Sequence, residues 1–131
     1  MAAPNILALN TATGKTTYLT PSGTTAVVLL QNAASSNKVL KINQIVAANI
    51  NGTNAVDCTV AIYTNGGVAQ GSAPSGGTAF PIASTISVPA DASLIVVDKT
   101  TAIYLEENAS ITVTSGTANG ITYSISYEDL S

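Results

Sequence analysis

The feature that most constrains the fold of this chain is a two-residue alternation of apolar and polar side chains. It is clearest in residues 121–128, where Ile and Tyr alternate with Thr, Ser and Glu, and in residues 56–63. Successive side chains of a β-strand point to opposite faces of a sheet, so this period predicts half-buried strands. No stretch repeats its apolar residues at the spacing of an amphipathic helix, and the abundance of Val, Ile and Thr also favours strands. The alternation therefore predicts an all-β protein.

Turn residues divide this pattern into eight or nine strands. Besides the two named above, we expect strands near residues 15–19, 25–32, 38–50, 82–88, 93–98, 102–106 and 109–115. Asn-Gly pairs favour tight turns, so Asn51-Gly52 predicts a long hairpin over residues 38–63, and Asn119-Gly120 predicts another between the last two strands. Short strands of this number predict one antiparallel β-sandwich domain over residues 1–131, with jelly-roll or immunoglobulin-like topology. The sequence does not choose between these topologies.

Two segments depart from the alternation and are candidates for contact with other molecules. Residues 1–14 form either a first strand or an N-terminal arm that reaches a neighbouring subunit. Residues 65–78 are uncharged and rich in Gly, Ser and Ala, which predicts a flexible exposed loop, with or without a role. Tyr63 borders this loop on the polar side of its strand, so it is a candidate anchor for an interface. The candidate interface residues are Asn5, Ile6, Leu7, Tyr63, Val68 and Gln70.

The composition removes most catalytic and metal-binding chemistries. The chain has no histidine and one cysteine, Cys58. A Ser–His–Asp or Cys–His nucleophile therefore cannot form, and a tetrahedral zinc site lacks its ligands. Glu106 and Glu107 would point to opposite faces of a strand, so they cannot flank one substrate as the two carboxylates of a glycosidase do. We expect no catalytic residue, no cofactor and no metal, and a buried thiol at Cys58.

Charge is unusually sparse. Charged residues make up 8% of the chain and none of them is arginine, whereas a typical soluble domain has about 25%. The net charge of −3 does not suit nucleic acids, which need clustered cations. A Thr, Ser and Asn surface has little charge to keep copies apart, which favours packing against neighbours. The longest apolar run, residues 26–30, is far shorter than the roughly 20 residues of a membrane span, and no signal peptide is visible. We expect no nucleic-acid and no membrane partner.

Several segments together resemble a known family. They are KVLKIN at 38–43, NINGTNA at 49–55, IASTISVPADA at 82–92, LIVVDK at 94–99, IYLEE at 103–107 and SYED at 126–129. In these segments the chain resembles small virion structural proteins of tailed phages that infect cyanobacteria. The resemblance extends over about residues 1–131 and is weakest in residues 65–81.

The resemblance implies a β-rich, non-enzymatic protein of the phage particle. The leading expectation is a capsid decoration, or cement, protein that binds the major capsid protein between capsomers and self-associates, with a trimer favoured. It would be made in the host cytoplasm and reside on the capsid surface. An alternative is a tail, baseplate or fibre component that binds a host-surface glycan through an aromatic or acidic patch. A third is a small carbohydrate-active enzyme, which would need two opposed carboxylates across a groove.

Overall fold

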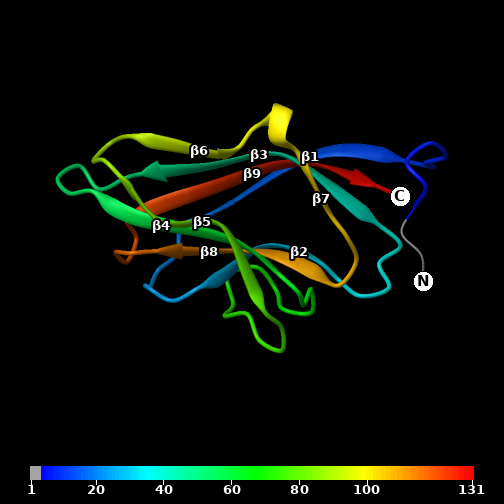
Figure 1. The fold of residues 1–131 in the computed structure, drawn as a ribbon, viewed down its shortest axis with the longest axis horizontal. Coiled ribbons are helices and arrows are strands. Elements are labelled where there is room, and N and C mark those ends of the chain that lie inside the picture. The colour runs from blue at the N-terminus through cyan, green and yellow to red at the C-terminus, as the bar shows by residue number, and fades with distance from the viewer. Residues whose placement is uncertain (1–3) are drawn as a thin grey trace.

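The computed structural model describes residues 4–131, and these form two antiparallel sheets packed face to face (Figure 1). The strands are β1 (Ala12–Leu19), β2 (Val27–Asn32), β3 (Val39–Asn49), β4 (Val56–Tyr63), β5 (Ala79–Val88), β6 (Ser93–Val97), β7 (Ile103–Leu105), β8 (Ala109–Ser115) and β9 (Ile121–Leu130). One 3-10 turn, η1 (Lys99–Thr101), follows β6. The prediction of an all-β antiparallel sandwich is confirmed.

The strand order is that of a jelly roll. One sheet has the order β1-β9-β3-β6, with β7 also paired to β3, and the other has the order β2-β8-β4-β5. Five antiparallel pairings are therefore nested along the chain: β1 with β9, β2 with β8, β3 with β6 and with β7, and β4 with β5. The chain amounts to one long hairpin whose tip is the β4–β5 loop, wrapped so that successive pairs lie in alternate sheets. Of the two topologies that the sequence left open, the structure has this one.

Both hairpins predicted from Asn-Gly pairs are wrong. The strands that flank Asn51-Gly52, β3 and β4, lie in different sheets, and so do β8 and β9, which flank Asn119-Gly120. Each pair therefore lies at a corner where the chain crosses between the sheets. Asn119 has a φ of 56°, a left-handed conformation that tight turns use. The local turn chemistry is thus present, but long-range pairing decides which strand each flanking segment joins.

The alternating residues fill the space between the sheets. On β9, Ile121, Tyr123 and Ile125 are fully buried, whereas Ser124 lies on the half-exposed opposite face, as predicted. Cys58 on β4 is also fully buried, and burial raises the pKa of its thiol, so it behaves as a core side chain. Burying each large aliphatic side chain contributes about 1.5–3 kcal/mol. The other large, fully buried side chains include Leu29, Ile42, Ile45, Leu105 and Ile111.

Candidate interaction surfaces

The N-terminal segment, residues 4–9, lies outside both sheets and presents an apolar side chain to solvent. Its turn is built by Asn5, whose carbonyl oxygen accepts a hydrogen bond from the Ala8 N–H at 2.9 Å. The Asn5 side-chain oxygen accepts a second bond, from the Leu7 N–H at 2.9 Å. This is an Asx-type turn, which fixes the local backbone without help from other segments. Leu7 lies at its tip and is 92% exposed.

The same segment borders an apolar hollow of about 250 Å³. The hollow is lined by Pro4, Ile6, Val39, Tyr104 and Glu106. Ile6 and Tyr104 are each about half exposed, and the exposed Leu7 follows Ile6 in the chain. We call Ile6, Leu7 and Tyr104 the N-terminal patch. Two of the three candidate residues in this segment thus belong to one surface, and the third, Asn5, shapes it.

Residues 1–14 were expected to form either a first strand or an arm. The described part of this segment contains both, with the boundary at Asn10. The backbone N–H groups of Asn10 and Thr11 both donate to the carbonyl oxygen of Ser131, and β1 begins at Ala12 and pairs with β9. The last part of the segment therefore belongs to a first strand, whereas residues 4–9 are available to contact another molecule. Residues 1–3 lie outside the described part of the chain.

Tyr63 is a correction to the sequence-based expectation. It is only 8% exposed, and its hydroxyl accepts a hydrogen bond from the Gly77 N–H at 2.9 Å. Tyr63 lies on the outer face of β4, as the alternation predicts, because β4 pairs with β8 without a shift of register. It is buried because the β4–β5 loop returns over that face at Gly77. Tyr63 therefore supports the β4–β5 loop from beneath and is too buried to anchor an interface.

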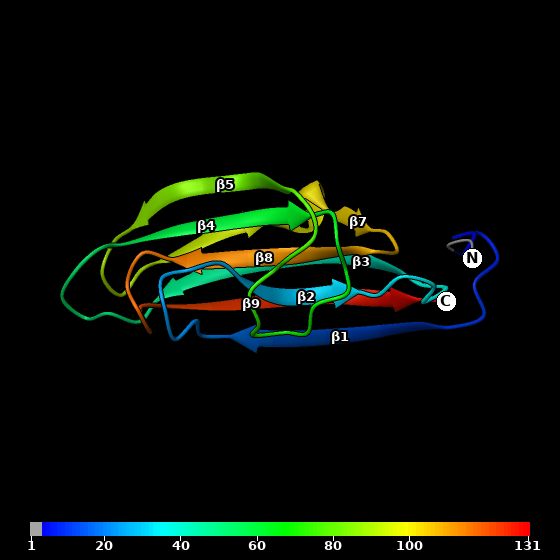
Figure 2. The ribbon, with the colours of Figure 1, turned by 90° about the horizontal axis from the view of Figure 1, so that it is seen from below.

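Gln70 ties the β4–β5 loop to the opposite side of the sandwich. Its side-chain N–H groups donate to the Thr17 hydroxyl at 3.0 Å, to the Tyr18 carbonyl at 3.3 Å and to the Leu29 carbonyl at 2.9 Å. Thr17 and Tyr18 belong to β1, and Leu29 belongs to β2. Figure 2 shows the loop crossing β2 to reach the level of β1. Gln70, expected as an interface residue, thus makes intramolecular contacts.

Backbone hydrogen bonds attach the same loop to the edge of β2. The Val28 N–H donates to the Ser72 carbonyl at 3.0 Å, and the Gly71 N–H donates to the Val28 carbonyl at 2.8 Å. These are the bonds that an additional strand would make, so the loop covers part of an otherwise open sheet edge. Val68, another candidate, is half-buried in this loop. The segment predicted to be a flexible, exposed loop is therefore attached to the domain along the edge formed by β1 and β2.

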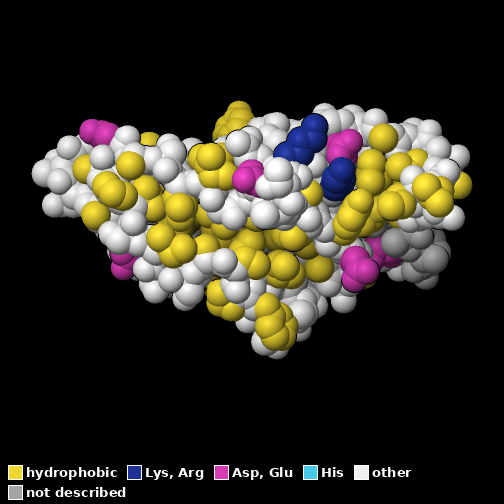
Figure 3. All heavy atoms as spheres, turned by 45° about the horizontal axis from the view of Figure 1, so that its top comes forward, with side chains coloured by type: hydrophobic (Ala, Val, Ile, Leu, Met, Phe, Trp, Pro, Cys, Tyr) yellow, Lys and Arg dark blue, Asp and Glu magenta, His cyan; other side chains and the backbone are white. Residues whose placement is uncertain are grey.

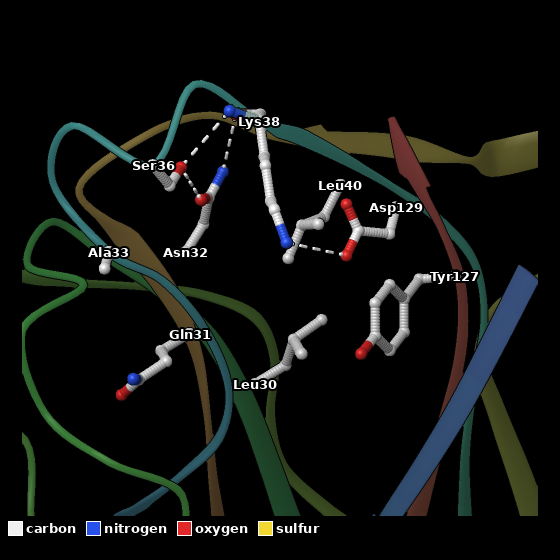
Figure 4. Close-up of a pocket in the computed structure, with 9 residues that line it drawn as sticks. All are labelled: Leu30, Gln31, Asn32, Ala33, Ser36, Lys38, Leu40, Tyr127 and Asp129. Carbon is white, nitrogen blue, oxygen red and sulfur yellow. Dashed lines mark hydrogen bonds and ion pairs between the residues drawn. The ribbon is translucent and has the colours of Figure 1, made fainter. Parts of the chain in front are cut away.

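A polar hollow of about 210 Å³ lies at the end of this edge (Figure 4). Its lining residues are Leu30, Gln31, Asn32, Ala33, Ser36, Lys38, Leu40, Tyr127 and Asp129. The side-chain N–H groups of Asn32 donate to the backbone carbonyls of Lys38 and Leu105, each at 3.0 Å. The Asn32 oxygen accepts a bond from the Ser36 hydroxyl. Asn32 is thus engaged within the chain and fastens the connection between β2 and β3.

Asp129 in the same hollow is paired with two lysines. One of its oxygens lies 2.9 Å from Lys15 Nζ and 3.2 Å from Lys38 Nζ. Burial opposes ionisation of this carboxyl, but the hydrogen bonds and charges of the two lysines outweigh burial, and the pKa of Asp129 lies below its ordinary value. The polar groups of the hollow therefore bond to one another and connect the ends of neighbouring strands. Tyr127 is the one aromatic side chain among the lining residues.

The other edge of the sandwich is apolar and uncovered. Figure 2 shows β5 at the side of the domain opposite β1, and within residues 4–131 β5 pairs only with β4 and β6 only with β3. Phe80, Ile82 and Ile86 of β5 are 58%, 41% and 40% exposed, and Ile95 of β6 is 58% exposed. We call these four residues the β5–β6 edge. Phe80 and Ile86 pair with the core-facing Ile62 and Cys58, whereas Ile95 pairs with Val46 and lies on the outer face of β6. Figure 3 shows hydrophobic side chains in a band across this view of the molecule, with few charges within it.

The described residues offer few other groups for chemistry. Across residues 4–131, no three His, Cys, Asp or Glu side chains are grouped as metal ligands. Glu106 is exposed and Glu107 is half-buried in the turn that follows β7, where neither lies opposite the other across a groove. In the same part of the chain, no helix has the length and hydropathy of a membrane span. Sequence reasoning identified the N-terminal segment but missed the β5–β6 edge.

Inferences about the function of this chain rest on the geometry of these surfaces. Comparison of the chain with known protein families, with curated proteins and with solved structures gives no match.

Proposed function

We propose that this chain is a non-enzymatic structural protein of a phage virion that decorates the capsid, binding the major capsid protein between capsomers. The observation that carries the proposal is the N-terminal turn, which holds Leu7 92% exposed outside the sandwich. Single exposed apolar residues are ordinary, but Leu7 follows Ile6 in the chain, and Ile6 and Tyr104 line an apolar hollow. Groups of exposed apolar residues mark contact sites. Burying Leu7 against a partner contributes about 1.5–3 kcal/mol to binding.

The fold and the surface composition support a contact role. Jelly rolls occur in viral capsid and lectin domains, although a fold alone does not establish a function. The sequence segments named above resemble phage virion proteins. The sparsely charged surface lets this chain lie against a shell or against its own copies without strong repulsion. In this proposal it is a homo-oligomer on the capsid surface.

The geometry gives less support to a tail component that binds a host glycan. Such a site needs an aromatic face together with polar groups that are free to bind hydroxyls. The polar hollow offers Tyr127, but its Asn32 and Asp129 side chains already bond within the chain. Capsid decoration therefore remains the proposal.

The experiment is to measure the amount of this protein relative to the major capsid protein in purified particles. Decoration predicts hundreds of copies per particle, whereas a tail location predicts a few. Particles stripped of the protein are then reloaded with the purified chain. The double variant Ile6→Ser with Leu7→Ser should bind at least about tenfold more weakly, which corresponds to about 1.4 kcal/mol. Tyr18→Ser, a change to an exposed aromatic on β1, should bind normally. A handful of copies, or equal binding by the double variant, would contradict the proposal.

A further inference from the structure

We infer that the β5–β6 edge is where two copies of this chain associate about a two-fold axis, with their apolar edges in contact. This inference goes beyond shell binding and rests on different residues, since the N-terminal patch takes no part in it.

The two lateral edges of the sandwich differ in whether another segment of the chain covers them. The β1–β2 edge is covered by the β4–β5 loop, through Gln70 and the backbone bonds to Val28. The β5–β6 edge has no such cover within residues 4–131. An open sheet edge exposes unpaired N–H and C=O groups that favour pairing with another chain. A fold that covers one edge with its own loop and leaves the other apolar has a surface suited to a partner.

β5 projects beyond the core, because only Ala83 and Val88 among its ten residues are buried. Its exposed residues therefore occupy both faces of the strand, and only the side chains of Ala83 and Val88 pack on the core of the domain. Edge strands are commonly protected by lysine or other charges, but β5 and β6 contain no ionisable residue. Contact with another molecule would remove this surface from water.

The distribution of charge favours a second copy as the occupant. Identical surfaces can meet only if they do not place like charges opposite one another, and the β5–β6 edge itself is uncharged. Asp91 lies in the turn at one end of β6, and Lys99 lies in η1 at the other end. A two-fold axis across the edge reverses the second copy, so Lys99 of each copy would lie toward Asp91 of the other. Lys99 forms no ion pair with any of residues 4–131, and the neighbouring Asp98 carboxylate is engaged by Thr100 and Thr101.

The exposed apolar area of the β5–β6 edge is enough for a dimer of moderate affinity. If a large side chain offers roughly 200 Å², the exposed fractions of Phe80, Ile82, Ile86 and Ile95 correspond to about 400 Å². A standard interface takes about 800 Å² from each partner, so these residues supply about half, and hydroxyl-bearing neighbours supply the rest. We expect a dissociation constant on the order of micromolar, because area of this size leaves little surplus over the cost of association.

Features of β5 also explain why the contact would stop at two copies. Pro81 lacks a backbone N–H, and Thr85 has a φ of 47° beside a shift in register with β4. Both interrupt the regular ladder that open-ended strand addition needs. Side-chain contact about a two-fold axis uses each edge once and closes.

The test is analytical ultracentrifugation of the purified chain without particles, over protein concentrations around the micromolar range. The wild type should show a monomer–dimer equilibrium, and Phe80→Ser with Ile95→Ser should raise the dissociation constant at least tenfold. Tyr18→Ser and Leu7→Ser, which alter exposed apolar residues elsewhere, should leave it unchanged. Thermal melting followed by circular dichroism verifies that each variant is folded.

A charge variant tests the two-fold arrangement itself. Lys99→Glu should weaken the dimer several-fold, and adding Asp91→Asn should restore part of the affinity, since asparagine also tolerates the left-handed backbone of that position. A monomer at all concentrations, a trimer, or a dimer unaffected by the Phe80 and Ile95 changes would overturn the inference. None of these results depends on capsid binding, so failure here is distinct from failure of the proposed function.

Discussion

Lys15 on the first strand and Asp129 on the last strand form an ion pair, with 2.9 Å between Nζ and Oδ2 and 114 residues of sequence between them. Lys38, just before β3, adds a second pair to the same oxygen at 3.2 Å. Because β1, β9 and β3 are neighbours in one sheet, Asp129 joins three strands at the place where the chain completes its fold. A single carboxylate thus holds together segments that are far apart in the sequence.

Replacing Asp129 should therefore destabilise the domain and change its response to acid. Asp129→Asn should lower the free energy of unfolding at neutral pH by about 1–2 kcal/mol. This is less than the roughly 1.5–3 kcal/mol of hydrogen bonds to charged groups, because both lysines are nearly half exposed. The pKa of Asp129 is lower in the folded protein than its ordinary value. Its stabilising contribution is therefore complete above the unfolded pKa of about 3.9 and is lost as the pH falls through the folded pKa. Urea unfolding measured from about pH 7 to pH 2 should show a smaller acid-dependent loss in the variant than in the wild type.

Glu128→Gln is the matched control for Asp129. Glu128 is more exposed, and its ion pair within residues 4–131, to Lys41, is longer, at 3.8 Å. Exposed pairs of this kind contribute about 0–1 kcal/mol. Equal acid profiles for the wild type and Asp129→Asn would contradict the role assigned to Asp129.

Gln70 should contribute to stability through its contacts with β1 and β2. Gln70→Ala removes the donors to three oxygen atoms, and we expect a loss of about 1–2 kcal/mol. Amide hydrogen exchange should also increase at Val28 and Gly71, whose N–H groups are protected by the attached loop. Gln44→Ala, a change to an exposed glutamine on β3, provides the comparison. Unchanged exchange in the Gln70 variant would show that the backbone bonds alone hold the loop.

The individual strands could be predicted from the sequence because alternation is a local property. The partner of each strand could not be. β9 pairs with β3 from Val39 through Asn49, and nothing within β9 or in the Asn119-Gly120 turn specifies that strand. The local turn signal instead suggested β8, which lies in the other sheet. The exposure of Tyr63 was misjudged for a related reason, because the β4–β5 loop covers the outer face on which Tyr63 lies, and the path of a loop is not a local property of the sequence.

The candidate surfaces show the same limit. The N-terminal segment could be recognised because its residues lack alternation. The β5–β6 edge could not, because Ile82 and Ile86 belong to a run that alternates like a half-buried strand. Their exposure follows from the position of β5 at the end of its sheet, which is a property of the topology.

Gly66 should not tolerate a side chain. It is buried where the β4–β5 loop begins, and a Cβ atom there would overlap the backbone carbonyl of Asn32 and approach the backbone nitrogen of Ala109. Backbone atoms cannot move aside as a flexible side chain can, so Gly66→Ala should cost about 2–3 kcal/mol. Gly14→Ala on β1 meets no atom within 4 Å and should be neutral or slightly stabilising. Thermal melting of the two variants makes the comparison, and similar melting temperatures would contradict the close approach of the loop to β2.

Ile125 gives the most direct test of how the last strand is oriented. It is 0% exposed and lies opposite Ile45 of β3 on one side and Thr17 of β1 on the other. Ile125→Asp would remove a buried aliphatic side chain and place a charge where no lysine reaches it, so we expect a loss of about 4 kcal/mol or more and an unfolded protein. Ser124→Asp places the same charge on the half-exposed outer face one residue earlier, and it should remain folded with a change below about 1 kcal/mol. The two variants differ only in the face of β9 that receives the charge. Comparing their near-ultraviolet circular dichroism and cooperative melting therefore shows which face is buried. A cooperatively melting Ile125→Asp protein would mean that β9 turns its isoleucines away from the core.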